Sequence, residues 1–340
     1  MTITLTPLAP VGRTHTPAGK VLARLGFATL AVLTALPALA QTAWPTKPIR
    51  IIEPAVAGSA VDVYIRRVAP KLSEALGQPI IIENRPGANS AIGAREAARA
   101  PADGYTIFHA NINNSINDAL IGDNCCRLTQ EFAPVTRLTS TALMMVVHPS
   151  VPATTLKEFV DYARANPDVL TYASGGTGAI TQLIGERLKM VAGIKVREVP
   201  YKSIGAELPD LTAGHVKTAF LAPIVISQHV KAGRLRALAV PEARRAPSMP
   251  DVPTMAEAGV SGVDATGWNG IFVPAGTPEP VIRRLQQEFS KVLNLKEVRD
   301  EAASLATEVG GESTEEFTTF VRSEIAKWGR VIKEAGIKAE

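Results

Sequence analysis

The stretch from Thr171 to Ala179 combines glycine and hydroxyl-bearing residues at a predicted turn between a strand and a helix. Glycines let a backbone approach a ligand closely, and the first N–H groups of a helix have no intrahelical partner. Because these donors and the positive end of the helix dipole point the same way, such a turn suits an anion. The candidate contacts are Ser174, Gly175, Gly176, Thr177, Gly178 and Ala179.

Two further loops repeat this pattern of strand, small residues and helix. The first follows the predicted strand that ends at Glu53, and its candidate contacts are Ala55, Ala57, Gly58, Ser59 and Ala60. The other follows Pro200, and its candidate contacts are Tyr201, Lys202, Ser203, Gly205 and Ala206. Glycines at such turns often serve only steric needs, but three similar loops together predict convergence on one small anionic molecule.

A few polar side chains near these loops have both structural and functional interpretations. Arg85 follows a predicted strand end and is a candidate to face the ligand, although surface ion pairing is the default for it and for Lys202. Asn111 is placed either to contact a ligand or to cap the next helix. Asp62 is interpreted as a helix-capping or first-turn acid, because a carboxylate would repel an anionic ligand.

The residue types give little support to catalysis or cofactor binding. Ser174 is the candidate nucleophile for a periplasmic hydrolase, but it lacks the Gly-x-Ser-x-Gly elbow. No Cys and His spacing fits a metal site, and we predict neither a metal nor a cofactor. The only cysteines, Cys125 and Cys126, are adjacent, so a disulfide between them would be strained and a pair of thiols is the simpler interpretation.

Residues 1–40 have the pattern of an export signal. Three basic residues without acids precede an apolar run that is too short for a stable membrane span, and Ala38-Leu39-Ala40 resembles a signal-peptidase site. We predict cleavage after Ala40 and a periplasmic mature protein; a retained membrane anchor is the alternative. Of the chain's 36 Lys and Arg and 32 Asp and Glu residues, only those three bases are in the signal. The mature chain is therefore almost neutral, and nothing in it indicates nucleic-acid binding.

Strand and helix patterns alternate through the remaining chain, which predicts an α/β fold with helices on the faces of parallel strands. There are two such series, before and after about Thr139, and the chain is predicted to rejoin the first near Trp268. We therefore predict two lobes, residues 41–139 plus 263–340 and residues 140–262, with a cleft and a two-stranded hinge. Separate strands are predicted at 133–137 and 142–147, and a cap at Thr314 for the last helix.

Several strings of residues resemble the Bug family, the TctC-like periplasmic solute-binding receptors of tripartite tricarboxylate transporters. They occur in the family's order through the whole mature chain and include Asn84-Arg-Pro-Gly-Ala88, Arg99-Ala-Pro-Ala-Asp-Gly-Tyr-Thr106, Val199-Pro-Tyr-Lys202 and Phe272-Val-Pro-Ala-Gly-Thr-Pro278. The resemblance implies a two-lobed periplasmic-binding-protein fold of type II-like architecture, with two mixed sheets and a small carboxylate between the lobes. It also implies a membrane permease or a sensor kinase as partner, and we expect a monomer.

The departures from the family pattern lie mostly in the three loops. Ala55 stands where the family usually has an aromatic residue, Ser59 where it has glycine, and Leu221 where it often has an acid. Loss of the aromatic leaves room, and Leu221 removes a partner for an ammonium group. The sequence therefore predicts a larger, less polar carboxylate rather than an amino acid; a receptor that no longer binds a ligand is the alternative.

Overall fold

The computed structural model describes residues 44–121, 127–202 and 204–338, and residues 2, 4, 7, 9, 10 and 12 of the N-terminal segment. The predictions of a cleaved signal with its site at Ala40, of the Cys125–Cys126 pair and of a role for Ser203 lie outside these residues. The chain divides into two units, Met1–Thr46 and Lys47–Glu340, and the elements named below belong to the second. Among the described residues, no helix has the length and apolar character that a bilayer crossing requires.

The larger sheet has six strands in the order β11-β4-β10-β3-β1-β2. β1, β2 and β3 run parallel, whereas β10 runs antiparallel to both β3 and β4, so the sheet is mixed. The strands are β1 (Ile49–Glu53), β2 (Ile80–Asn84), β3 (Thr106–Asn111), β4 (Phe132–Ala142), β10 (Thr266–Pro274) and β11 (Glu308–Val309).

The smaller sheet has five strands in the order β7-β6-β8-β5-β9. β6 is parallel to β7 and β8, and β5 is antiparallel to β8 and β9, so this sheet is also mixed. Its strands are β5 (Met144–Val147), β6 (Thr171–Ser174), β7 (Arg197–Pro200), β8 (Thr218–Leu221) and β9 (Arg236–Ala239).

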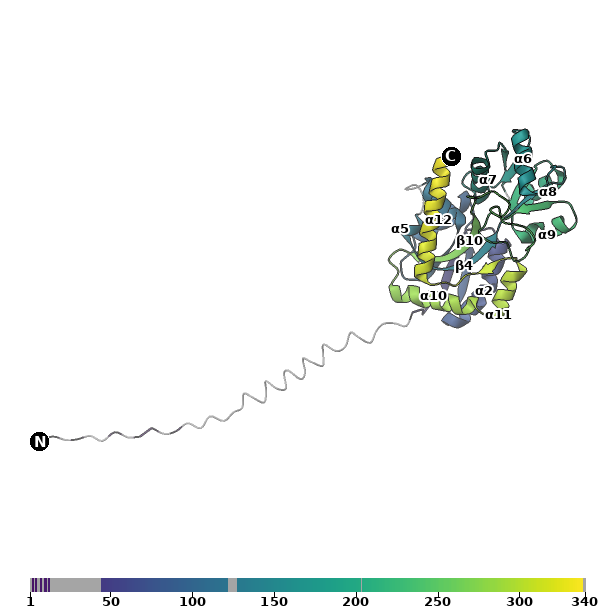
Figure 1. The fold of residues 1–340 in the computed structure, drawn as a ribbon. Helices are drawn as coiled ribbons and strands as arrows, with labels where there is room; N and C mark the ends of the chain where they lie inside the picture. Colours follow the sequence, from purple (N-terminus) through teal and green to yellow (C-terminus); the bar gives the residue numbers. More distant parts are fainter. Residues whose placement is uncertain are drawn as a thin grey trace. The chain divides into compact units, whose positions relative to one another are not determined.

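Helices flank both sheets (Figure 1). Those that follow strands of the larger sheet, or come after it, are α2 (Ala60–Leu76), α3 (Ala91–Ala98), α4 (Ile112–Ile121), α5 (Leu128–Glu131), α10 (Glu279–Leu293), α11 (Lys296–Ser304) and α12 (Thr314–Ala335), with a short 3₁₀ helix η1 (Ala88–Ser90). Those inserted among the strands of the smaller sheet are α6 (Leu156–Ala165), α7 (Ile180–Ala192), α8 (Ile204–Ala213) and α9 (Pro223–Lys231).

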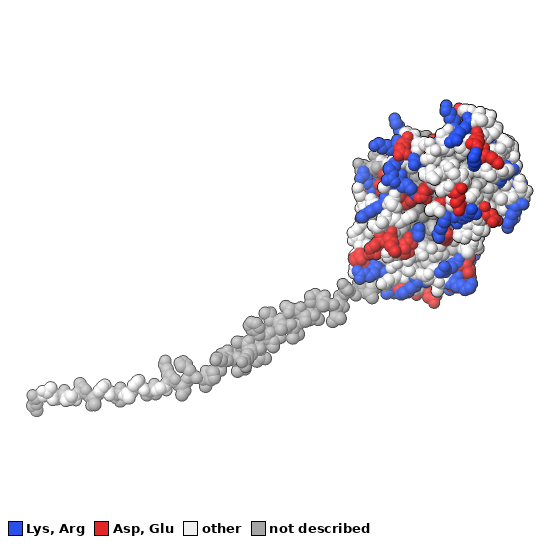
Figure 2. Space-filling view, in the orientation of Figure 1, with Lys and Arg blue, Asp and Glu red and all other residues white. Residues whose placement is uncertain are grey.

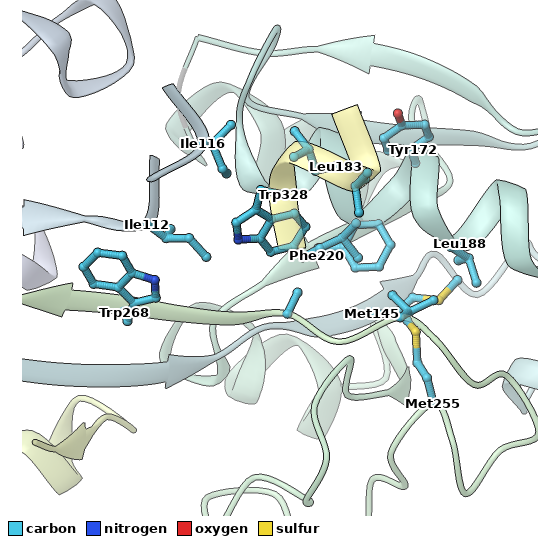
Figure 3. Packing of buried hydrophobic residues seen from close by; sticks show 14 of the residues in the cluster. Ile112, Ile116, Met145, Tyr172, Leu183, Leu188, Phe220, Met255, Trp268 and Trp328 are labelled. Carbon is cyan, nitrogen blue, oxygen red and sulfur yellow. The ribbon is translucent and has the colours of Figure 1, made fainter. Parts of the chain in front are cut away.

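A hydrophobic core continues from one sheet to the other. Trp328 of α12 lies among Ile112 of α4, Leu183 of α7 and Phe220 of β8, all of them buried (Figure 3). Helix α12 packs against both α4 and α7, so it joins the elements around the two sheets. Burial of aromatic and aliphatic side chains of this size is the main source of stability in such a core.

The predicted α/β architecture with two mixed sheets is confirmed. Two local predictions were wrong. β4 is one strand up to Ala142, because it pairs with β10 along its whole length, and β5 begins only at Met144. Helix α12 is capped by Ser313 rather than Thr314, in a capping box with Glu316. The lobe boundaries at residues 139 and 263 stay predictions.

Candidate functional site

The predicted loops follow the carboxyl ends of parallel strands in both sheets. In the larger sheet Glu53 pairs with Asn84, so the loop at residues 54–59 lies beside the connector after β2. In the smaller sheet Ser174 pairs with Pro200, and the Tyr201 N–H donates to the Ser174 carbonyl over 2.8 Å. Each sheet therefore presents one edge on which these loops gather, as ligand sites in open α/β sheets do.

The two edges meet at an asparagine. Asn89, in the connector after β2, donates from Nδ2 to the Gly178 carbonyl over 2.9 Å. Asn117 of α4 donates to the Asn89 carbonyl over 2.8 Å, and this bond helps to fix the position of Asn89. Gly178 has a φ of 75°, in the left-handed region that favours glycine, and a Cβ added there would also press on a methyl group of Leu120. We call the Asn89–Gly178 hydrogen bond the clasp.

The loop at residues 54–59 forms hydrogen bonds with the residues around it. The Ala55 N–H donates to Glu53 over 2.9 Å, and the Ala55 carbonyl accepts from Asn84 over 3.0 Å. The Gly58 N–H donates to Asp62 over 2.9 Å. Ala57, Gly58 and Ala60 are exposed, while Ala55 and Ser59 are partly buried. The N–H groups of two candidate contacts, Ala55 and Gly58, are therefore bonded to carboxylates of the protein.

Asp62 is the centre of a buried polar network at the start of α2. Its side chain is 2% exposed, and it accepts from the Gly58 N–H, from Arg66 over 3.0 Å and from Asn84 over 2.8 Å. Burial alone would raise the pKa of Asp62, but the hydrogen bonds from Arg66, Asn84 and Gly58 outweigh it and lower this pKa. The structural interpretation of Asp62 as a first-turn acid is confirmed.

A buried pair that our sequence reasoning missed lies beneath this loop. His109 Nδ1 contacts the Glu53 carboxylate, and both side chains are 1% exposed. The other Glu53 oxygen accepts from Ala55, so the pair fixes the start of the loop. The register of β1 and β3, with Ile52 opposite Phe108, sets the two side chains next to each other. The sequence signal that could have found the pair is that Glu53 and His109 each follow a short apolar run typical of a buried strand.

The glycine loop after β6 is cross-linked by its own side chains. Ser174 is fully buried and donates to Glu198 of β7, while its Oγ accepts from the Gly176 N–H over 3.1 Å. The Gly178 N–H donates to Gln182 over 2.9 Å, and Gln182 donates in turn to Glu198 over 3.1 Å. The loop keeps its shape through these bonds, and the partner of Ser174 is a carboxylate rather than a histidine.

Helix α7, which follows this loop, begins without a side-chain cap. Its N-cap residue is Ala179, which is buried, and the first-turn N–H groups of Ile180 and Thr181 have no intrahelical partner. Helix α9 also begins without a side-chain cap, at Ala222 with Pro223 in its first turn. An uncapped helix start concentrates orphan donors and positive potential where an anion is favoured.

The loop after β7 is anchored at one end. The Tyr201 hydroxyl donates to Asp210 over 2.8 Å, and burial together with this bond raises the pKa of Tyr201 to about 12. Lys202, Gly205 and Ala206 are exposed. Glu207, in the first turn of α8, is 4% exposed, and its Oε1 has no hydrogen-bond partner in the described part of the chain. Burial raises the pKa of Glu207 to about 7.

Three other predicted contacts are engaged within the protein. Arg85 donates to Glu96 over 2.7 Å and to Glu83 over 3.0 Å, in the ion pairing that we named as its default. Asn111 accepts from the Asn113 N–H over 3.0 Å, which is a local bond at the start of α4. Leu221 is 2% exposed within the hydrophobic cluster of the smaller sheet. No cluster of three or more potential metal ligands occurs among the described residues.

Comparison with known proteins extends these observations. Residues 64–337 match the family model described as "Tripartite tricarboxylate transporter family receptor". Protein BugT of Bordetella pertussis is 28% identical over 321 residues, which cover 94% of this chain and 98% of BugT. Among solved structures, Rpa4515 of R. palustris with adipate is 31% identical with a TM-score of 0.77, covering 87% of this chain and 99% of its own. MatC of Rhodopseudomonas palustris with bound malate is 28% identical with a TM-score of 0.74, covering 85% of this chain and 100% of its own.

The fold and the opposed strand edges are those of a two-lobed solute-binding protein. The chain belongs to the tripartite tricarboxylate transporter receptor family, whose solved members include periplasmic binding proteins. The resemblance to the Bug family is confirmed, and the family is one of receptors. Which residues of this chain contact the ligand stays a prediction.

Proposed function

We propose that this receptor captures a small carboxylate between the two strand edges and delivers it to a membrane permease of the tripartite tricarboxylate type. The observation that carries the proposal is the uncapped start of α7, which follows the glycine loop and lies at the edge where the clasp joins the sheets. Backbone N–H groups at such a start bind a carboxylate reversibly, because they provide donors without a full counter-charge.

The chemical class of the ligand is inferred from the side chains near the loops and from the pairs that they already form within the protein. Arg85 is paired with Glu83 and Glu96, so recognition rests on backbone donors rather than on that cation. The adipate and malate bound to two related receptors are both dicarboxylates. Ala55 lacks the bulk of an aromatic residue, and Leu221, which is buried in the hydrophobic cluster, supplies no acid that could pair with an ammonium group. We therefore favour a dicarboxylate with an apolar spacer over an amino acid.

The proposal excludes catalysis. Ser174 is fully buried, and its hydroxyl donates to Glu198 and accepts from the Gly176 N–H, so it is held inside the loop and is not presented to a substrate. Both signs of charge are interspersed on the visible face of the mature unit (Figure 2), which is a surface without the basic track that nucleic acid requires. We further propose export with cleavage after Ala40 and action as a monomer; a sensor kinase is the alternative membrane partner.

Binding is tested with the mature protein, residues 41–340, against adipate, malate, benzoate and aspartate by thermal shift and calorimetry. Adipamide, the neutral isostere of adipate, is the matched control. A ligand at one hundred times its Kd should stabilise the fold by about 2.7 kcal/mol, and the amide should have no effect. Stabilisation by amino acids alone, or equal binding of adipamide, would overturn the proposal.

The hydrolase alternative is tested with a panel of esters. Turnover by the wild type but not by Ser174→Ala would favour the hydrolase instead.

The membrane partner is tested in cells. Photo-crosslinking from exposed Lys202, followed by mass spectrometry of membrane proteins, should recover a permease subunit if the receptor serves uptake. Recovery of a histidine kinase in its place would support the sensor alternative. Ligand binding by the purified receptor is independent of this result.

A further inference from the structure

A cavity of about 530 Å³ lies away from the three loops, where the chain passes between the two sheets. One wall is the end of β4, at Ser140, Thr141 and Ala142, together with Thr266 at the start of β10. A second wall is the link after β9, at residues 242–248, and a third is residues 303–308 from α11 to β11. Elements attached to both sheets thus enclose a volume typical of a small-molecule site.

The polar side chains that line the cavity differ in whether they form ion pairs and hydrogen bonds within the protein. Arg137 pairs with Glu312 over 3.0 Å, and Arg244 pairs with Glu308 across the cavity, so these charges are compensated. The Thr141 and Thr307 hydroxyls bond to each other over 2.8 Å. Two buried atoms of the lining, Arg137 Nε and Glu242 Oε1, have no hydrogen-bond partner in the described residues, but only Glu242 also forms no ion pair there. A buried acceptor without a donor is costly and calls for an explanation.

The remaining lining defines what would fit beside Glu242. Ala142, Ala243, Ala246, Pro247 and Ala303 give the cavity apolar walls. With both arginines paired, Glu242 and the exposed Asp264 leave an uncompensated negative charge, which disfavours an anion and favours a cation. We propose that this cavity binds a small organic cation, a primary amine or amidine with a short apolar body, whose charged end donates to Glu242.

The electrostatics of the site support this assignment. Burial, with the negative charges of Glu308 on β11 and Asp264 before β10, raises the pKa of Glu242 to about 7, against the opposing effects of a hydrogen bond from Thr266 and of the charge of Arg244. A bound cation stabilises the ionised carboxylate. Amine binding should therefore strengthen as the pH rises through about 7 and weaken below it. The site takes the opposite charge from the proposed carboxylate site, so the two proposals stand or fall separately.

The test uses three probes of the same shape on the mature protein. Benzylamine is the cation, benzyl alcohol the neutral isostere and benzoate the anion, each titrated into ¹⁵N-labelled protein at about pH 8. Benzylamine should shift the amide signals of Thr266 and Thr307, with at least about tenfold weaker effects from the alcohol and none from benzoate at these positions. Equal binding of the alcohol, or no shift at these two amides, would overturn the proposal.

Two variants and a control locate the interaction. Glu242→Gln keeps the shape of the side chain but removes its charge, and it should weaken benzylamine at least about tenfold and abolish the pH dependence. Asp251→Asn removes a charge from the same link outside this cavity and should leave binding unchanged. Ala303→Leu fills the cavity from α11 and should block benzylamine without altering the charge. Wild-type affinity in either Glu242→Gln or Ala303→Leu would refute the site.

Discussion

The helices α2 and α7 each follow a predicted binding loop, yet their N-termini are built in opposite ways. The start of α2 has a Ser59 cap and the buried Asp62, which takes the Gly58 N–H. The start of α7 has Ala179 and no side-chain cap. A helix that already holds its own carboxylate has little left to offer an anionic ligand. The difference assigns anion recognition to the edge of the smaller sheet and a supporting role to the loop before α2.

Helix α8 adds a third case. Like α2 it has a buried acid in its first turn, but Glu207 leaves one oxygen without a partner, whereas Asp62 has several donors. Their pKa values accordingly move in opposite directions, upward for Glu207 through burial and downward for Asp62 through its donors. A first-turn acid is therefore stabilising in this fold only where donors surround it.

The largest effect should come from breaking the α2 network. Asp62→Ala leaves the Gly58 N–H without its acceptor and removes one of the two acceptors of Asn84 Nδ2, and we expect the free energy of unfolding to fall by about 2–3 kcal/mol at neutral pH. Because the folded pKa of Asp62 lies below its usual value, this contribution is present above that value and is lost as the pH falls through the lowered pKa. Urea unfolding at several pH values measures both effects.

The matched control is Asp161→Ala, another acid in an i,i+4 ion pair, but on the exposed surface of α6 with Lys157. It should change the unfolding free energy by at most about 0.5 kcal/mol. Equal losses in the two variants would show that Asp62 is only a surface charge, and the contrast between α2 and α7 would then have no energetic basis.

The next largest effect should come from Glu207 of α8, where a substitution should raise the free energy of unfolding rather than lower it. Burial raises the pKa of Glu207 to about 7 from 4.5, so the wild type loses stability as the pH rises between these values. Glu207→Gln removes this loss and should stabilise the fold by about 2 kcal/mol at pH 8, with almost no gain near pH 4.5. Glu279→Gln, which changes an exposed first-turn acid of α10, should show no such pH dependence. A pH-independent gain in Glu207→Gln would contradict this explanation.

The contrast is tested directly by giving α7 the kind of cap that α2 has. Ala179→Ser supplies a side-chain acceptor for a first-turn N–H and should raise the unfolding free energy by about 1 kcal/mol. If these N–H groups bind the carboxylate, the same change should weaken adipate or malate about tenfold in calorimetry, because the hydroxyl competes for the donors. Ala222→Ser, at the uncapped start of α9, should stabilise the fold without loss of affinity. The reverse outcome would move the anion site from α7 to α9.

Sequence patterns were sufficient for the architecture because apolar periodicity and turn residues report it locally. The alternation of strands and helices was predicted from these patterns, and the strand predicted to end at Glu53 is β1 (Ile49–Glu53). Hydrogen bonds between distant residues were not predictable. Nothing local indicates that Glu198 would hold Ser174 and Gln182, or that Asp62 would take the N–H of Gly58. The positions of the loops between strand and helix were therefore predicted correctly. The side chains that accept hydrogen bonds from several of their backbone N–H groups were not predicted.

Removal of the clasp, the hydrogen bond between Asn89 and Gly178, should have the smallest effect on stability. It also tests whether the start of α7 depends on the larger sheet. Ala88, Asn89 and Ser90 have φ values of 46°, 49° and 74°, in the left-handed region that disfavours residues with a Cβ. Asn89→Gly relieves this strain but removes the donor to Gly178, whereas Ala88→Gly relieves similar strain at an exposed residue and leaves the clasp intact. We expect the Ala88→Gly variant to be more stable than the Asn89→Gly variant by about 0.5–1 kcal/mol in urea unfolding.

The same two variants test whether the clasp positions α7 for the ligand. If it does, Asn89→Gly should weaken carboxylate binding several-fold, while Ala88→Gly should bind as the wild type does. Equal affinities would mean that the start of α7 binds its anion without help from the opposite edge.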